Sequence, residues 1–235
     1  MPGRSFPSPL WKRGGCAMVK VLIFRRWSAV KCTVLFASPR PEGNTRQLLE
    51  PCLAELRKLG WETELFPLYG LDIRPCTACR ACQKDWNSFG CCQADDLHPV
   101  FASLLSADLI LLATPIYSWY CTPPLKAAMD RLVYGMNKYY GAEKGPALWA
   151  GKALATLVTC GYPPEKGADL WEAGLKRYAR HSRLRYLGML AEHDPGYKDT
   201  FMDPDKALRA ADFAWRLDGE LQGIAPAAAG HTDKE

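Results

Sequence analysis

The sequence of 235 residues has no long hydrophobic run. Its most apolar stretch, residues 107–115, contains Asp108 and ends at Pro115, so it falls well short of the roughly eighteen residues of a membrane span. A secretion signal is also missing, because the apolar residues 21–24 are too few and no small-residue cleavage site follows them. We therefore expect a soluble, cytoplasmic protein with no membrane partner.

Two widespread nucleotide-binding motifs are absent. The chain has no glycine-rich P-loop ending in Gly-Lys-Ser/Thr, and it has no spaced-glycine fingerprint of a dinucleotide-binding unit. Hydrolysis of nucleoside triphosphates and a Rossmann-type site are therefore not indicated. Histidine is scarce as well. The four histidines are scattered along the chain, and we expect ordinary surface or core positions for them.

Charge is present in modest excess and is unevenly placed. Much of the net charge of +5 lies in residues 1–31, where seven basic residues have no acidic counterpart. We expect this stretch to be a basic extension outside the fold. The remaining chain is close to neutral and carries no nucleic-acid footprint. Its ten cysteines, with no export signal, indicate reduced thiols rather than a disulfide scaffold.

Short apolar runs with strand character alternate with stretches of helical spacing. We expect strands at residues 34–36, 61–65, 108–113, 153–158 and 184–190. We expect helices at residues 48–59, 95–105, 123–133 and 168–182, and a last helix capped by Asp203. This alternation predicts an α/β domain with a mostly parallel sheet covered on both faces.

Three of the expected strands end in unusual loops, with the sequences ASPRPEGNT, ATPIYSW and VTCGY. Ligands of open parallel sheets bind beyond the carboxyl ends of the strands, so all three loops should line one binding edge. In the first loop, Ser38, Asn44 and Thr45 supply donors, Gly43 allows close approach and Arg40 adds charge. A helix N-terminus follows, which favours a phosphate ligand. The alternative is that these residues merely cap the helix.

The same loops carry a family resemblance. SPRPEGNT resembles the phosphate loop of the flavodoxin-like NAD(P)H-dependent FMN reductases, ATPIYSWYCTPPLKAAMDRL is similar to their second flavin loop and its helix, and VTCGY resembles the third loop. The resemblance implies a flavodoxin-like three-layer sandwich with a five-stranded parallel sheet in the order 2-1-3-4-5. The domain would span residues 32–222, followed by a disordered tail over residues 223–235.

The resemblance also assigns a cofactor and its contacts. The FMN phosphate would be held by Ser38, Arg40, Gly43, Asn44 and Thr45. The isoalloxazine and ribityl chain would contact Pro115, Ile116, Tyr117, Ser118 and Trp119, and the other edge would be closed by Thr159, Cys160, Gly161 and Tyr162. NAD(P)H would deliver hydride and a quinone, flavin, nitro compound or similar small acceptor would take it, with no acid–base residue required. Related enzymes are commonly homodimers, and residues 134–140 are the interface candidate.

Five cysteines gather in the segment RPCTACRACQKDWNSFGCC. Cys76, Cys79 and Cys82 have CxxCxxC spacing, and Cys91 and Cys92 follow after eight further residues. The segment resembles the iron-sulfur flavoproteins of the same superfamily, which implies a 4Fe-4S cluster on Cys76, Cys79, Cys82 and Cys91 or Cys92. Two alternatives stay open: a structural loop at the flavin or dimer edge, and thiol–disulfide chemistry between Cys79 and Cys82. Zinc is the less expected metal.

The sequence thus predicts an FMN-dependent oxidoreductase. Two rival functions remain. One is a non-enzymatic electron carrier in which a cluster at the cysteine segment exchanges electrons with the flavin. The other is a regulatory binding protein that keeps the fold without turnover.

Overall fold

The computed structural model describes residues 30–194, 196 and 199–223. Residues 1–29 of the expected basic extension and residues 224–235 of the expected disordered tail lie outside the described residues, whereas Lys31, expected outside the fold, is the first residue of β1. The strands are β1 (Lys31–Phe36), β2 (Glu62–Pro67), β3 (Leu109–Pro115), β4 (Ala153–Cys160) and β5 (Arg185–His193). The helices are α1 (Asn44–Lys58), α2 (Leu97–Ser106), α3 (Pro123–Met136), α4 (Pro164–Gly167), α5 (Asp169–His181) and α6 (Pro204–Gln222).

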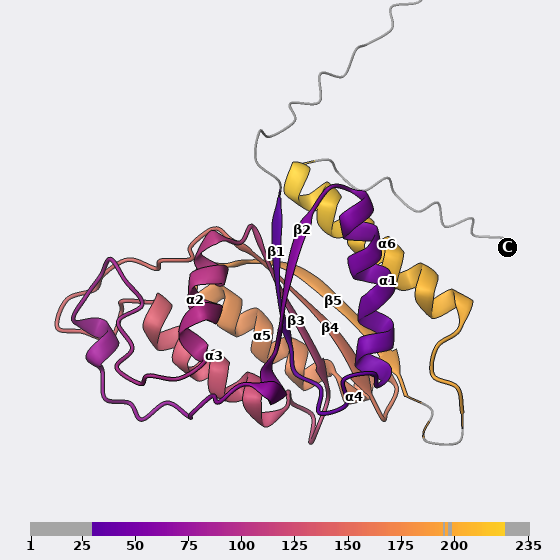
Figure 1. The fold of residues 1–235 in the computed structure, drawn as a ribbon, viewed down its shortest axis with the longest axis horizontal. Helices are drawn as coiled ribbons and strands as arrows, with labels where there is room; N and C mark the ends of the chain where they lie inside the picture. Colours follow the sequence, from indigo (N-terminus) through magenta and orange to yellow (C-terminus); the bar gives the residue numbers. More distant parts are fainter. Residues whose placement is uncertain (1–29, 195, 197–198, 224–235) are drawn as a thin grey trace, which may run out of the picture.

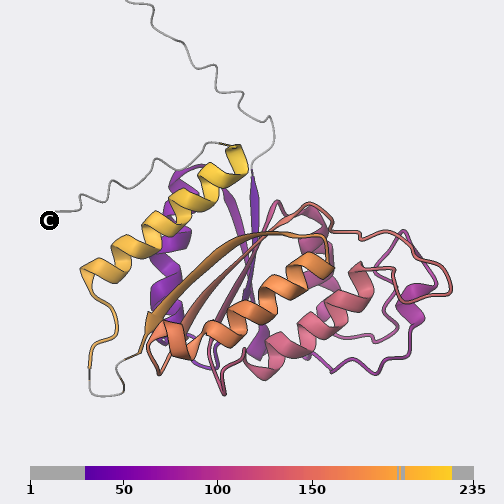
Figure 2. The ribbon, with the colours of Figure 1, turned by 180° about the vertical axis from the view of Figure 1, so that it is seen from behind.

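The five strands form one parallel sheet in the order β2-β1-β3-β4-β5, which confirms the predicted topology. Helices α1 and α6 cover one face of the sheet, and α2, α3 and α5 cover the other (Figure 1). Seen from behind, α3 and α5 lie side by side over the second face (Figure 2). The flavodoxin-like three-layer architecture is therefore present.

The two hydrophobic cores follow from the period of two in a strand. In β1 the adjacent residues Val34 and Leu35 are both fully buried, but Val34 packs under α1 and α6 while Leu35 packs toward α2 and α3. A strand buried on both faces needs a continuous apolar run, which is what β1, β3 and β4 have. This rigid centre fixes the positions at which the strands end.

The expected element boundaries differ from the observed ones in an informative way. Strand β2 begins after Trp61, whose buried indole instead donates a hydrogen bond from Nε1 to Asp218 at 2.8 Å. Strands β3 and β4 each run two residues further than expected, to Pro115 and Cys160. The first residues of the second and third loops are thus the last residues of strands, which holds them firmly. At the other end of the chain, Asp203 caps α6 as predicted, accepting from the Lys206 N–H at 2.7 Å.

Within the parts of the chain that the structure describes, no helix combines the length and the apolar character that crossing a bilayer requires.

Candidate functional site

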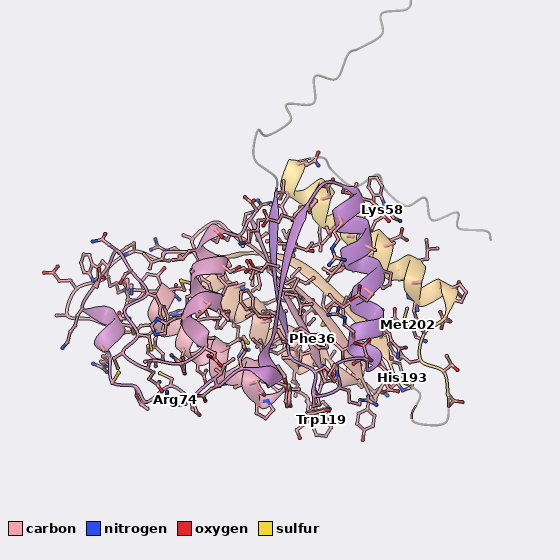
Figure 3. The ribbon with its side chains drawn as sticks, viewed as in Figure 1. Phe36, Lys58, Arg74, Trp119, His193 and Met202 are labelled. Carbon is pink, nitrogen blue, oxygen red and sulfur yellow. The ribbon has the colours of Figure 1, made fainter. Side chains whose placement is uncertain are left out.

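The three loops predicted to line one edge do meet there. Backbone bonds join the loop starts, with Ala37 N–H donating to Ala113 O and Ile116 N–H donating to Thr159 O, both at 2.8 Å. The hydroxyls of Thr45 and Thr159, both buried, are hydrogen-bonded at 2.8 Å and tie the first loop to the third. Phe36, Trp119 and His193 lie toward this end of the sheet, and Lys58 lies at the opposite end (Figure 3).

The first loop is pre-shaped by its own hydrogen bonds. The Ser38 hydroxyl accepts from the Arg40 N–H at 3.2 Å and donates to the Arg40 carbonyl at 3.1 Å, and the Gly43 N–H donates to the same carbonyl at 3.1 Å. A Cβ on Gly43 would lie only 2.8 Å from the Arg40 Cβ, so the turn closes tightly only with glycine at this position. The Arg40 side chain is exposed, and its Nε would lie 3.1 Å from the same added Cβ, so the guanidinium lies beside the N-cap of α1.

The N-terminus of α1 is an electrostatically open site. Its N-cap is Gly43, whose backbone is extended. Because glycine has no side chain, the first-turn N–H groups receive no capping hydrogen bond. The first turn also contains no acidic residue. About half a positive charge at the helix end is therefore left without a negative partner from the cap or the first turn. An anionic phosphate fits this end of the helix.

The second loop adopts a tight hairpin turn. Tyr117 and Tyr120 exchange two backbone hydrogen bonds, and the residues between them, Ser118 and Trp119, have φ of 51° and 61°. Positive φ at both central positions is typical of a type I′ turn, which normally takes Asn and Gly. Serine and tryptophan there are strained by roughly 1–3 kcal/mol each, and such strain clusters at binding sites.

This turn presents aromatic surface at the site. Trp119 is nearly parallel to Tyr162 of the third loop, with ring centroids 6.1 Å apart, and its Nε1 donates to the Lys166 carbonyl at 3.1 Å. Tyr117, Trp119 and Tyr162 are all about half exposed despite their size. Tyr120 differs, since its ring packs edge-on against Trp171 in the core. Three aromatic rings are therefore available to a planar ligand.

Cys160 is at the predicted position but faces inward. Its Sγ donates to the Tyr162 carbonyl at 3.2 Å, and burial raises the pKa of the thiol to about 11. A neutral, buried thiol at the end of β4 shapes the third loop and offers the site only its backbone.

Sequence reasoning missed Thr122, which connects the first two loops. Its hydroxyl donates to the Ala37 carbonyl at 2.8 Å, its N–H donates to the Thr114 hydroxyl at 3.3 Å, and the residue is fully buried. A threonine directly before Pro123 is a recognisable N-cap signal in the sequence. Its hydrogen bond to the Ala37 carbonyl, 85 residues away, has no signal in the local sequence.

The cysteine segment forms a pocket of its own against α3, whose residues Arg131 and Tyr134 contribute to the lining. Four of its cysteines line this pocket: Cys76, Cys79, Cys82 and Cys91. Cys92 does not line it, but its Sγ lies 3.5 Å from the Cys79 Sγ. The structure therefore places Cys79 beside Cys92, whereas the Cys82 thiol is directed to the Tyr134 carbonyl at 3.5 Å. All are free thiols.

Arg131 of α3 forms one wall of the pocket. Its side chain is 1% exposed and pairs with the fully buried carboxylate of Asp95, and its Nη2 donates to the Cys91 Sγ at 3.3 Å. Its Nε is buried without a hydrogen-bond partner. Burial alone would raise the pKa of Asp95, but hydrogen bonds from Arg131 and from the Arg74 and Leu97 N–H groups outweigh it, and this pKa is lowered.

Among the described residues, no three histidine, cysteine or acidic side chains are arranged to hold a single metal ion. A cubane cluster poses a different requirement, because each of its thiolates binds a different iron and the four sulfurs need not converge on one point. Four thiols around one pocket, with an unpartnered guanidinium nitrogen in its wall, match such an anionic group in ligand type, and the cavity of about 20 Å³ between them would have to widen to hold it.

Comparison with known proteins agrees with this geometry. Residues 30–168 match the family model described as NADPH-dependent FMN reductase. An iron-sulfur flavoprotein of Methanocaldococcus jannaschii is 33% identical over 102 residues, which cover 43% of this chain and 51% of that protein. The chain thus spans about half the length of the curated relatives that it matches.

Solved structures show the same fold at low identity. An NAD(P)H:quinone oxidoreductase from Methanothermobacter marburgensis superposes with a TM-score of 0.62 at 19% identity, covering 81% of this chain and 98% of that one. RosB, solved with 8-demethyl-8-formylriboflavin-5'-phosphate, superposes with a TM-score of 0.57 at 18% identity, covering 83% and 80%.

Thr122→Val tests the connection between the loops. The substitution keeps the shape but leaves the buried Ala37 carbonyl without its donor, so we expect a loss of about 1–3 kcal/mol in the free energy of unfolding. Urea unfolding measures it. Thr63→Val, which removes a surface hydroxyl that accepts from Arg57, should cost under about 0.5 kcal/mol. Equal effects of the two changes would contradict the role given to Thr122.

Proposed function

The chain belongs to the family of NADPH-dependent FMN reductases, and we propose that it transfers hydride from NAD(P)H to a quinone, flavin, nitro compound or similar small acceptor by way of bound FMN. The observation that carries the proposal is the open N-terminus of α1 at the edge where the three loops meet. When bound, FMN would supply the redox centre that takes up a hydride and passes it on.

The residues of the site have distinct tasks in this proposal. The first-turn N–H groups of α1 and the charge of Arg40 bind the phosphate, while Ser38 keeps the loop in the shape that presents them. Pro115 and Ile116, anchored at the end of β3, position the flavin ring, and Thr159 supports the opposite loop through Thr45. No proton donor is needed at a fixed atom, because hydride transfer is governed by stacking and distance.

The exposed aromatic rings support a stacked substrate. Trp119 and Tyr162 offer parallel faces at the mouth of the site, which suits nicotinamide or a planar acceptor in turn. We propose further that the protein works as a homodimer in the cytoplasm. In the interface candidate, residues 134–140, Asn137 and Lys138 are fully buried within the chain itself, which leaves the partly buried rings of Tyr134, Tyr139 and Tyr140 as the available contacts.

Asn44→Pro tests phosphate binding by a backbone amide. Asn44 is the first residue of α1 and follows extended Gly43, so proline fits there while removing one N–H. We expect FMN to bind roughly tenfold more weakly than in Asn44→Ala, which keeps the amide, because a charge-assisted hydrogen bond is worth about 1.5–3 kcal/mol. Riboflavin, which lacks the phosphate, should bind both variants equally. Fluorescence titration measures all four affinities, and an equal loss for both ligands would refute the phosphate site.

A second candidate function is electron transfer through an iron-sulfur cluster. The specific observation in its favour is the pocket lined by four cysteines, with the unpartnered Arg131 Nε in its wall. The iron-sulfur flavoproteins among the relatives support it. Cys76, Cys79, Cys82 and Cys91 would hold the cluster, which would supply a one-electron centre beside the flavin domain.

Anaerobic reconstitution with iron and sulfide tests this candidate and the choice of the fourth ligand. Cys91 lines the pocket and Cys92 does not, so Cys91→Ser should lose most of the bound iron while Cys92→Ser keeps it. Iron and acid-labile sulfide are measured per FMN. Protein that binds no iron excludes the cluster, and the reverse order of the two variants would assign Cys92.

A further inference from the structure

Two buried cations stand beside the cysteine pocket. Arg131 comes from the middle of α3 and Lys138 from the residues just after it, and their side chains are almost completely shielded from solvent. The flavin chemistry proposed above uses neither of them. Buried cations are rare unless they are paired, so the question is what balances their charge.

Lys138 has no carboxylate partner among the residues that the structure describes. Its Nζ donates to the carbonyl oxygens of Cys82 at 2.7 Å and of Phe89 at 3.2 Å, which are neutral acceptors. The acidic residue of the same loop, Asp85, is exposed and is bound by Ser88 and the Asn87 N–H, and it acts on Lys138 through a Coulombic interaction without forming an ion pair with it. The two hydrogen bonds occupy two of the three donors of the Lys138 ammonium group, but neutral carbonyl acceptors do not neutralise its charge.

Asp95 neutralises the charge of Arg131, but not every N–H donor of the guanidinium has a hydrogen-bond partner. Asp95 balances its charge, and that carboxylate is already shared with the Arg74 and Leu97 N–H groups. The guanidinium still turns Nη2 to the Cys91 Sγ, and its Nε has no partner. With two cations and one carboxylate, the buried surroundings of the pocket carry one net positive charge.

An anionic occupant of the pocket would balance this charge. Four thiolates on a cubane cluster give a group that is negative overall, and each added electron makes it more negative. A fixed cation nearby, shielded from water, lowers the free energy of the reduced form more than that of the oxidised form. We propose that Lys138, assisted by Arg131, is the charge-balancing residue of the cysteine pocket and makes its iron-sulfur cluster easier to reduce. This inference rests on the cluster of the second candidate function.

A purely structural role makes a different prediction. If Lys138 only holds the loop through the Cys82 and Phe89 carbonyls, removing its charge should affect cluster retention but not the potential of a cluster that is retained. The midpoint potential, measured by redox titration with EPR detection, therefore separates the two roles.

The experiment uses the reconstituted full chain and three variants. Lys138→Met removes both the charge and the hydrogen-bond donors, whereas Lys138→Arg keeps the charge. The control is Lys126→Met, which removes a lysine from the exposed side of α3, where it pairs with Asp130. We expect a more negative midpoint potential for Lys138→Met at an unchanged iron content. Lys138→Arg and Lys126→Met should stay at the wild-type potential.

Three results would overturn the inference, each in a recognisable way. An unchanged potential in iron-replete Lys138→Met refutes the electrostatic role while leaving the cluster in place. If Lys138→Met does not assemble the cluster, Lys138→Gln replaces it, because glutamine can still donate a hydrogen bond to a carbonyl. A midpoint potential of Lys138→Gln equal to that of Lys138→Arg then refutes the electrostatic role. Wild-type protein that takes up no iron removes the second candidate function and this inference with it.

Discussion

The positive end of α1 is the constraint on which the rest of the site depends. The helix begins at a glycine cap with no side-chain acceptor and no acidic first turn, so its dipole is unbalanced where β1 ends. A glycine at this position costs only about a few tenths of a kcal/mol of stability relative to a capping side chain. The buried bond between Thr45 and Thr159 then fixes this helix end against the third loop. In the proposed function, the helix end that binds the phosphate is therefore already in place before FMN arrives, which limits the entropy lost on binding.

Helix α3 links the two parts of the molecule that carry chemistry. It starts directly after the second loop, where Thr122 ties it to the first loop through the Ala37 carbonyl. Eight residues along, about 12 Å by the rise of a helix, Arg131 lines the cysteine pocket. One rigid element thus sets the spacing between the aromatic turn at the flavin edge and the thiols. In the second candidate function, this arrangement would place a cluster beside the flavin domain without altering the sheet.

Local patterns in the sequence were sufficient for the architecture. Continuous apolar runs predicted β1, β3 and β4, and the order of the strands followed from the resemblance of the three loops, which the sheet confirms. Sequence patterns did not predict contacts between residues that lie far apart in the chain. The Arg131 partner Asp95 is 36 residues away and the Lys138 partner Cys82 is 56 residues away, so no periodicity could announce either one. The local sequence around each of the two cations gave no sign that its side chain is buried. The contact between the Cys79 and Cys92 thiols was hidden for the same reason, because the two residues are 13 positions apart.

The most direct test of the phosphate site is the ionisation of the bound cofactor. A free phosphate monoester titrates near pH 6, and an unbalanced helix end reinforced by Arg40 stabilises its dianion. Phosphorus NMR of the FMN-loaded protein should therefore show a single resonance whose chemical shift stays constant from about pH 5 to pH 8. A resonance that titrates near pH 6, as that of free FMN does, would contradict the account.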